Sequence, residues 1–192
     1  KYSYNLTRDS AGRIAQRIEN IAGETITWDY GYDSLSRLIE VKKNGTTTES
    51  YSYDANGNRL TDSSRPYSYS AEDHIITAGV NTYQFNADGF LTSKTTASGT
   101  TTYQYSSRGE LLSVTKPDGT VITYDHDPMG RRIAKKVNGV ITEKYLWKDA
   151  ITLLAVYDGN NNPLMRFSYA DGRMPVSMIT GGVVYYLAYD QV

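Results

Sequence analysis

Two short stretches place acidic and amide side chains at the alternating spacing that calcium-binding loops use. They are DANGN (residues 54–58) and DGNNN (158–162), and oxygen ligands at every second position suit Ca²⁺. The sixth residues are Arg59 and Pro163, whereas a calcium loop of this type needs a glycine there. Both stretches consist of the residues that hairpin turns commonly use. We therefore interpret them as turns and predict no metal site.

Side chains suited to catalysis are scarce. The chain has no cysteine and two histidines, His74 and His126, each alone at or near an expected turn. His126 takes a place that aromatic residues fill elsewhere in the chain, which favours packing over catalysis. Neither a GxSxG nucleophile segment nor a GxxxxGK[ST] phosphate loop occurs. We therefore predict no enzyme, no catalytic residue and no cofactor.

The charges are balanced, with 20 lysine and arginine residues against 21 aspartate and glutamate residues and a net charge of −1. Phosphate binding draws on an excess of basic residues, so we expect no nucleic-acid partner. No apolar stretch approaches the ~20 residues of a membrane helix, so we expect no membrane insertion. The sequence begins in the middle of a repeating pattern, which we interpret as a piece of a longer protein.

Tyrosine is the unusual component, with 18 residues against three phenylalanines. A tyrosine has an apolar ring and a polar tip, so it suits surfaces that are half in contact with water. This composition predicts a thin structure and not a thick aliphatic core.

The aromatic residues recur with a period near 20. An anchor residue precedes each expected turn, and a second aromatic residue lies two positions upstream. The anchors are Tyr32, Tyr53, Tyr69, Phe85, Tyr105 and His126, and the upstream rings are Tyr30, Tyr51, Tyr67, Tyr83, Tyr103 and Tyr124. Four residues after the anchor most copies have a glycine, at Gly57, Gly89, Gly109 and Gly130, with Ser36 and Asp73 in the same place. Such a period indicates a repeat architecture, and we expect these residues to have structural roles.

A second turn lies between successive anchors, at Asn44–Gly45, Ser98–Gly99, Asp118–Gly119 and Asn138–Gly139. Asn-Gly and Asp-Gly favour the type I′ turns of hairpins. The segments between turns are rich in Thr, Val, Ile and Tyr with a period of two, which is typical of strands. We predict an all-β fold, one antiparallel sheet of roughly sixteen to twenty strands of about five to eight residues.

An open sheet of this size curls, so we expect a bent single layer. We also expect rings one repeat apart to stack along a face, with their hydroxyls in water.

The repeated segments YDSLSRL (32–38), YDANGNRL (53–60) and DHDPMGRRI (125–133) resemble the Rhs or YD-repeat family. The resemblance covers about residues 2–169. The members of the family include bacterial polymorphic toxins, the C component of Tc toxins and teneurin ectodomains. It implies a hairpin sheet curled into part of a spiral β-shell, which in the toxins encloses a C-terminal effector. We interpret 1–145 as YD/Rhs repeats and 146–192 as terminal repeats that lead to the family's core-associated region, expected beyond this chain.

The family's autoprotease motif reads roughly aspartate-proline-x-glycine-leucine. DPMG (127–130) matches four of these letters, but Arg131 follows and the segment is in phase with the repeats. We interpret it as one more turn.

The resemblance implies a non-enzymatic shell segment of a bacterial protein that is secreted or delivered to the cell surface. Its partners would be the rest of its own polypeptide, namely flanking repeats and a toxin or effector cargo. Free sheet edges would also favour self-association. A repeat module that binds carbohydrate or cell surfaces remains the alternative, because tyrosines beside Asn, Asp and Arg suit sugar binding.

Overall fold

The computed structural model describes residues 2–170 and 172–189, which form nineteen β-strands and no helix. The described residues therefore include no helix that could cross a membrane. The chain divides into two compact units, Lys1–Tyr83 and Gln84–Val192, and the boundary falls within strand β9 (Asn81–Phe85). The predicted all-β fold is confirmed, and the number of strands lies in the expected range.

In the first unit each strand pairs antiparallel with the next one along the chain. The strands before β9 are β1 (Tyr2–Arg8), β2 (Ile14–Ile21), β3 (Glu24–Tyr32), β4 (Leu38–Lys43), β5 (Thr46–Tyr53), β6 (Arg59–Asp62), β7 (Arg65–Tyr69) and β8 (Ile75–Ala78).

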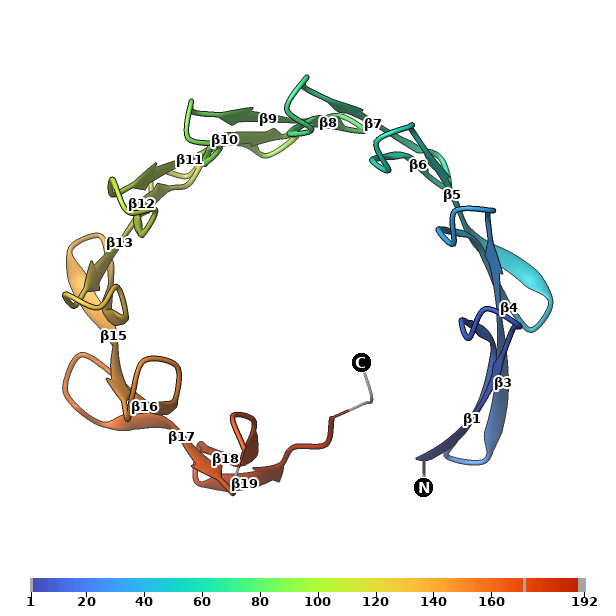
Figure 1. Ribbon diagram of the computed structural model, residues 1–192. Helices are drawn as coiled ribbons and strands as arrows, with labels where there is room; N and C mark the ends of the chain where they lie inside the picture. Colours follow the sequence, from blue (N-terminus) through green and yellow to red (C-terminus); the bar gives the residue numbers. More distant parts are fainter. Residues whose placement is uncertain (1, 171, 190–192) are drawn as a thin grey trace. The chain divides into compact units, whose positions relative to one another are not determined.

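The second unit continues the same hairpin order. Its strands are β10 (Leu91–Thr96), β11 (Gly99–Tyr105), β12 (Leu111–Thr115), β13 (Val121–His126), β14 (Arg132–Val137), β15 (Val140–Trp147), β16 (Leu153–Tyr157), β17 (Pro163–Tyr169), β18 (Pro175–Thr180) and β19 (Val183–Tyr186). Within this unit the strands follow an arc, so the sheet is bent as expected (Figure 1).

The apolar packing is one side chain deep. Upstream rings lie opposite small aliphatic residues on the next strand, as in the pairs Tyr30–Val41, Tyr67–Ala78, Tyr103–Val114 and Tyr145–Val156. These four aliphatic residues are among the few buried ones, with 5% to 9% of their surface exposed. No side chain of the described residues is less than 2% exposed. A ring across from a small residue thus replaces a conventional core.

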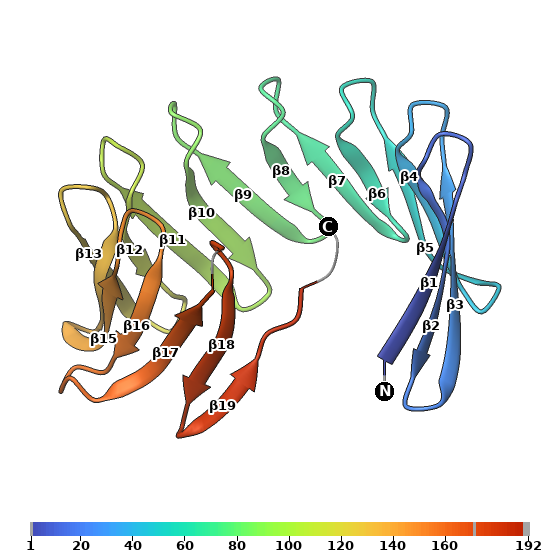
Figure 2. The ribbon, with the colours of Figure 1, turned by 60° about the horizontal axis from the view of Figure 1, so that its bottom comes forward.

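The turns after the odd-numbered strands β1 to β15 are called the anchor turns below; within each unit they lie at one end of the strands (Figure 2). They span residues 9–13, 33–37, 54–58, 70–74, 86–90, 106–110, 127–131 and 148–152. In the first seven, the N–H of the fourth residue donates to the carbonyl of the first. That fourth residue has φ between +61° and +92°, and this holds for Ser36 and Asp73 as well as for the glycines.

The opposite turns differ more from one another than expected. Asn44–Gly45 and Asn138–Gly139 have positive φ at both residues, as a type I′ turn requires. The expectation of a type I′ turn at Asp118–Gly119 is wrong. There Gly119 alone has positive φ, and its N–H donates to the Lys116 carbonyl, as in the anchor turns.

A register shift accompanies most anchors. The pairing slips between Gly31 and Tyr32, between Ser52 and Tyr53, and at the corresponding positions of later hairpins. A bulge of this kind bends its strand and increases the local twist. Regularly spaced bulges therefore explain why the sheet within each unit is bent without any helix packed against it.

Candidate functional site

The repeated chemistry of this protein lies in the anchor turns. In the first seven of them, called the regular turns below, the first residue is Asp, Asn or Ser, and its side-chain oxygen accepts the backbone N–H of the fifth residue. In the turn 33–37 the Asp33 carboxylate accepts the N–H of Arg37 at 2.9 Å and its Nε–H at 2.7 Å. The Arg37 backbone N–H lowers the pKa of Asp33; burial opposes this effect, and the Arg37 side chain adds to it. Asp33 therefore stabilises the turn conformation and orients the Arg37 side chain.

The fifth residue of an anchor turn also reaches the next repeat. Arg37 donates from Nη1 to the Asp54 carbonyl at 2.8 Å, and its guanidinium covers the ring of Tyr53. Arg13 makes the same two contacts, with the Asp33 carbonyl and the Tyr32 ring. Both contacts join two hairpins, in a sheet that has no second layer to hold them together.

Other residue types take over this bridging role in later turns. The Asn58 amide donates to Asp73 at 2.6 Å. Phe90 stacks on the ring of Tyr105, with the centroids 5.1 Å apart. Arg131 donates to the Asp149 carbonyl at 2.9 Å. The fifth residue therefore links two repeats in five of these turns, with side chains of different chemistry.

The anchor side chains form a second link between repeats. Their polar tips donate to the carbonyl of the first residue of an earlier strand. These bonds are Tyr32 to Ile14, Tyr53 to Leu38, Tyr69 to Arg59, Trp147 to Arg132 and Tyr169 to Leu153. Each of these tyrosine hydroxyls has a backbone acceptor 2.7 to 2.9 Å away, a contact that the expectation of hydroxyls in water did not include.

The expectation that rings one repeat apart stack on each other is wrong for several anchors and upstream rings. A guanidinium covers Tyr32, Tyr53, Tyr51 and Tyr124, from Arg13, Arg37, Arg59 and Arg132 respectively. The contact combines a cation with the negative face of the ring. It also occupies a ring face that a bound sugar would use.

Among the expected site residues, the upstream rings Tyr30, Tyr67 and Tyr103 pair with buried aliphatic residues, and Tyr51 lies opposite Asp62. Phe85 and Tyr83 lie on β9, and Gly57, Gly89, Gly109 and Gly130 occupy the positive-φ place of their turns. His126 precedes the turn 127–131, and its Nδ1 is buried without a hydrogen-bond partner among the described residues.

Three features were missed in the sequence. The bridging role of the fifth turn residue is one of them. Its signal in the sequence is the basic or polar residue that follows the glycine of the motif. Trp147 and Tyr169 extend the anchor series by 21 and 22 residues, but the turn after Trp147 has no glycine. For Trp147 and Tyr169, the spacing from the preceding anchor is the only signal in the sequence.

The stretches with metal or protease spacing are turns. Asp54 and Asp158 accept N–H groups of their own turns, and no group of three or more potential ligand side chains occurs in the described part of the chain. Asp127 of DPMG is held by Arg131 in the same way as Asp33 is held by Arg37.

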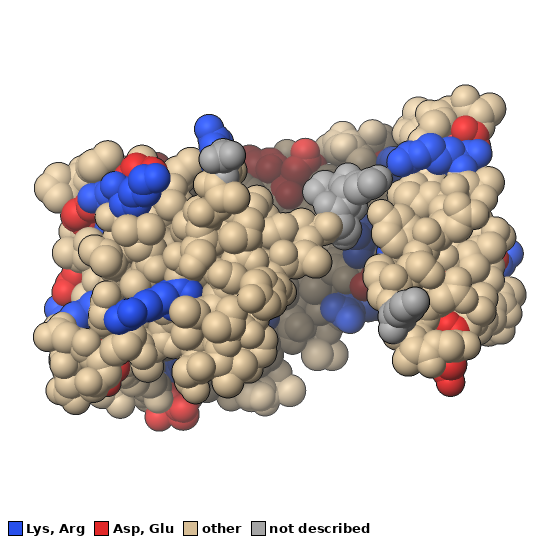
Figure 3. Space-filling model, turned by 90° about the horizontal axis from the view of Figure 1, so that it is seen from below, with Lys and Arg blue, Asp and Glu red and all other residues tan. Residues whose placement is uncertain are grey.

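One half-buried polar cluster lies in the second unit. The Glu143 carboxylate accepts from Lys135 and from the Tyr145 hydroxyl, both at 2.5 Å. Burial, together with this hydrogen bond, raises the pKa of Tyr145 to about 12. Elsewhere charges of both signs are scattered over a mostly uncharged surface (Figure 3), which gives no extended patch of one sign on the face shown.

Comparisons with known proteins agree with this geometry. The Teneurin YD-shell family model matches residues 1–192. The tRNA3(Ser)-specific nuclease WapA of Bacillus spizizenii is 27% identical over 168 residues, which are 88% of this chain and 6% of that protein.

Two solved structures have a similar fold. The crystal structure of TcdB2-TccC3 without its hypervariable C-terminal region has a TM-score of 0.57 at 14% identity, over 88% of this chain and 14% of that one. The TcdB2-TccC3-Cdc42 structure has a TM-score of 0.54 at 13% identity, over 93% and 13%. The chain therefore spans a small part of the length of the proteins it matches.

Proposed function

Since this chain belongs to the Teneurin YD-shell family, we propose that it is a section of the wall of a larger β-shell that encloses a polypeptide. The wall is non-enzymatic, and the cargo is a toxin or effector carried by the same secreted or surface-delivered protein. The family has a structural role as a shell, and our proposal adds that this shell encloses a cargo.

The observation that carries this proposal is the bonding between successive anchor turns. A wall around a cargo has to be thin and has to hold its curvature without a second layer. Arg37 meets this need by contacting the Asp54 carbonyl and the Tyr53 ring of the next repeat at once. Tyr53 adds a bond in the opposite direction, to Leu38. These two repeats are thus linked by contacts in both directions.

The relatives support a carrier role. One matched protein is a nuclease of which this chain would cover 6%, and one matched structure lacks a hypervariable C-terminal region. A constant wall beside a variable segment is the arrangement expected when one scaffold carries different cargoes.

The test uses the full-length product of the gene that encodes this chain. We expect a polypeptide segment outside the repeats that survives limited proteolysis in the native protein and is cut rapidly after unfolding in urea. The double variant Arg37→Ala with Arg131→Ala removes two bridges and should expose this segment sooner. Arg166→Ala is the matched control, because Arg166 is exposed and forms no ion pair with other described residues.

Mass spectrometry of the fragments identifies what is protected. If the segments outside the repeats are cut as fast in the native protein as in urea, the wall does not enclose them and the proposal fails.

A further inference from the structure

The bond from an anchor side chain to the backbone, called the tether below, follows a rule. Each polar tip donates to the carbonyl of the residue that pairs with the preceding anchor. Tyr169 donates to Leu153, which is paired with Trp147. Trp147 in turn donates to Arg132, which is paired with His126. A tether therefore ties each hairpin to the hairpin before it.

His126 departs from this rule. The rule assigns it to the carbonyl of Leu111, which is paired with Tyr105, but no hydrogen bond joins the imidazole to that carbonyl. A histidine side chain is shorter than a tyrosine, and the Nδ1 atom of His126 is buried without a hydrogen-bond partner among the described residues. The tether between the hairpins β11–β12 and β13–β14 is therefore missing.

The bridge from the fifth turn residue is missing at the same junction. The fifth residue of the turn before β12 is Glu110, whose carboxylate accepts from the Ser106 hydroxyl and pairs with Arg108 at 2.7 Å, both in its own turn. A carboxylate has no N–H to donate to the next turn, as Arg131 does one repeat later. Among the described residues, one side-chain hydrogen bond joins the two turns, from the exposed Arg108 to the Pro128 carbonyl at 3.2 Å.

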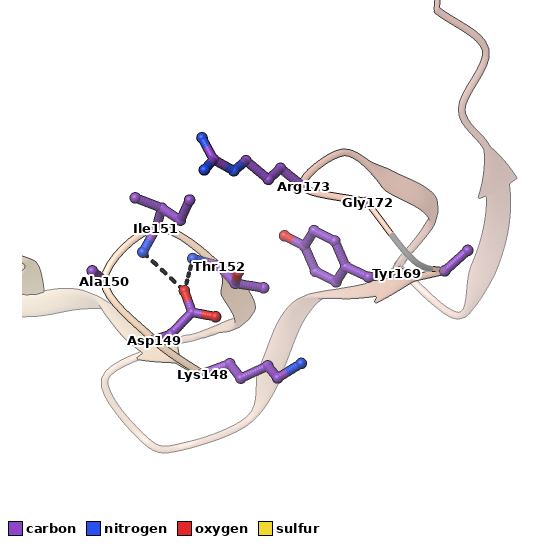
Figure 4. A pocket seen from close by; sticks show the side chains of 9 residues that line it. Lys148, Asp149, Ala150, Ile151, Thr152, Tyr169, Gly172 and Arg173 are labelled. Atoms are coloured by element: carbon purple, nitrogen blue, oxygen red, sulfur yellow. Dashed lines mark hydrogen bonds between the residues drawn. The ribbon is translucent and has the colours of Figure 1, made fainter.

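The other junctions of the second unit keep at least one of the two links. At the junction before, Phe90 stacks on the ring of Tyr105. At the junction after, Trp147 keeps its tether. Beside the turn 148–152 the tether of Tyr169 is kept, and Figure 4 shows its ring pointing toward that turn. Among the described hairpins of this unit, the junction between β12 and β13 alone lacks both links.

The backbone pairing at this junction is short as well. The ladder between β12 and β13 has three residue pairs, whereas the ladder between β13 and β14 has five. The ladder between β16 and β17 is equally short, but there the tether of Tyr169 is kept. Segments with few buried contacts and few protected hydrogen bonds open locally at a lower free energy than the whole chain unfolds.

We propose that the junction between β12 and β13 is a seam at which the sheet of this unit opens first, while the hairpins on its two sides stay folded. The inference rests on the proposed function in one respect, namely that an opening here is the point at which an enclosed polypeptide first becomes accessible. The seam itself is a property of the wall and needs no cargo.

Hydrogen exchange of the full-length gene product, followed by mass spectrometry, tests the seam. We expect the strand amides that pair across β12 and β13 to exchange at least about fivefold faster than those that pair across β14 and β15. His126→Tyr supplies a hydroxyl for the Leu111 carbonyl, so it should slow the exchange at the seam by about two- to tenfold, the effect of one hydrogen bond.

His126→Phe is the matched control, because it adds the ring without the hydroxyl. It should slow the exchange at the seam less than His126→Tyr does, and neither variant should change the exchange across β14 and β15. Circular dichroism verifies that both variants retain the β-fold. The wild-type comparison between the two pairs of strands needs no variant, so it decides the proposal even if a variant fails to fold.

Two results would overturn the proposal. One is equal exchange across β12–β13 and across β14–β15 in the wild type, and the other is equal exchange at the seam in the tyrosine and phenylalanine variants. Either result can occur while the protection experiment still finds an enclosed segment, so the shell would stand without a seam. If the protection experiment fails and the exchange shows the expected difference, the seam stands without a cargo.

Discussion

The guanidinium of Arg37 lies over the ring of Tyr53, with its Cζ atom 4.8 Å from the ring centroid. The same guanidinium holds Asp33 of its own turn at 2.7 Å and the Asp54 carbonyl of the next turn at 2.8 Å. A cation over a partly exposed ring contributes about 0.5–1 kcal/mol, and hydrogen bonds to charged groups contribute about 1.5–3 kcal/mol. Since no side chain of the described residues is less than 2% exposed, we expect such contacts to form a large part of the net stability.

The tyrosine hydroxyls contribute to stability through the backbone. Tyr53→Phe removes the bond to the Leu38 carbonyl and keeps the ring, so we expect a loss of about 1 kcal/mol in the free energy of unfolding. Tyr185→Phe is the control, because Tyr185 is 48% exposed on β19. Urea denaturation compares the two variants. Equal losses would mean that the hydroxyl-to-carbonyl bond does not stabilise the hairpin.

Two glycines with similar φ should respond differently to alanine. At Gly57 (φ +92°) an added Cβ meets no atom within 4 Å, so the cost is backbone strain of about 1 kcal/mol. At Gly109 (φ +86°) the Cβ would lie 2.8 Å from the Phe90 ring, which is held against Tyr105. We expect Gly109→Ala to lose about 1–3 kcal/mol more than Gly57→Ala.

The double variant Gly109→Ala with Phe90→Ala isolates the clash. The second change removes the ring, so the extra cost of the alanine at position 109 should disappear from the urea midpoint. If the extra loss of stability persists in the double variant, the Phe90 ring is not its cause.

Acid should destabilise the chain through its turns. The pKa values of Asp9 and Asp33 are lowered by hydrogen bonds from Arg13 and Arg37 respectively. A carboxylate with a lowered pKa in the folded state stabilises the fold above its unfolded value and loses that effect as the pH falls through its folded value. We therefore expect the melting temperature to be constant near neutral pH and to fall once the pH drops below the ordinary aspartate value of 3.8.

Asp33→Asn tests the origin of this effect. The amide oxygen can still accept backbone N–H groups, as Asn86 does, but it carries no charge. The variant should lose less stability than the wild type between pH 5 and pH 3 in thermal melts. A larger loss than in the wild type would contradict this assignment.

Tyr145 should be among the last tyrosines to ionise. Burial and the bond to Glu143 raise its pKa to about 12, from an ordinary value of 10.0. A raised pKa in the folded state gives stability below the unfolded value that is lost as the pH rises through the folded one. Absorbance at the phenolate band should show a late phase above pH 11 that Tyr145→Phe removes. If the titration curve of Tyr145→Phe is unchanged, the late phase belongs to another tyrosine.

The repeat and its hairpins were predictable because they depend on local chemistry. The aromatic spacing, the Asn-Gly turns and the glycine place at Gly57 each report on a few neighbouring residues. The positive φ of Ser36 follows from the same pattern, since its turn is closed by Asp33 as in the other copies.

The contacts between repeats were not predictable from spacing. Arg37 and Tyr53 are 16 residues apart, and their contact depends on the bulge at each anchor and on the direction in which Asp33 aims the guanidinium. The tyrosine content favoured ring stacking, but in the folded hairpins the Arg37 guanidinium covers the Tyr53 ring. The missing tether at His126 is visible only when the anchors are compared in the folded chain.

The most direct test of the account is a double-mutant cycle between Arg37→Ala and Tyr53→Leu, followed by urea denaturation. If contacts between successive turns hold the sheet together, the coupling energy should be about 0.5–2 kcal/mol, while Arg166→Ala combined with Tyr53→Leu should be additive. Full additivity of Arg37→Ala and Tyr53→Leu would contradict the account, because each repeat would then be stable without its neighbour's guanidinium.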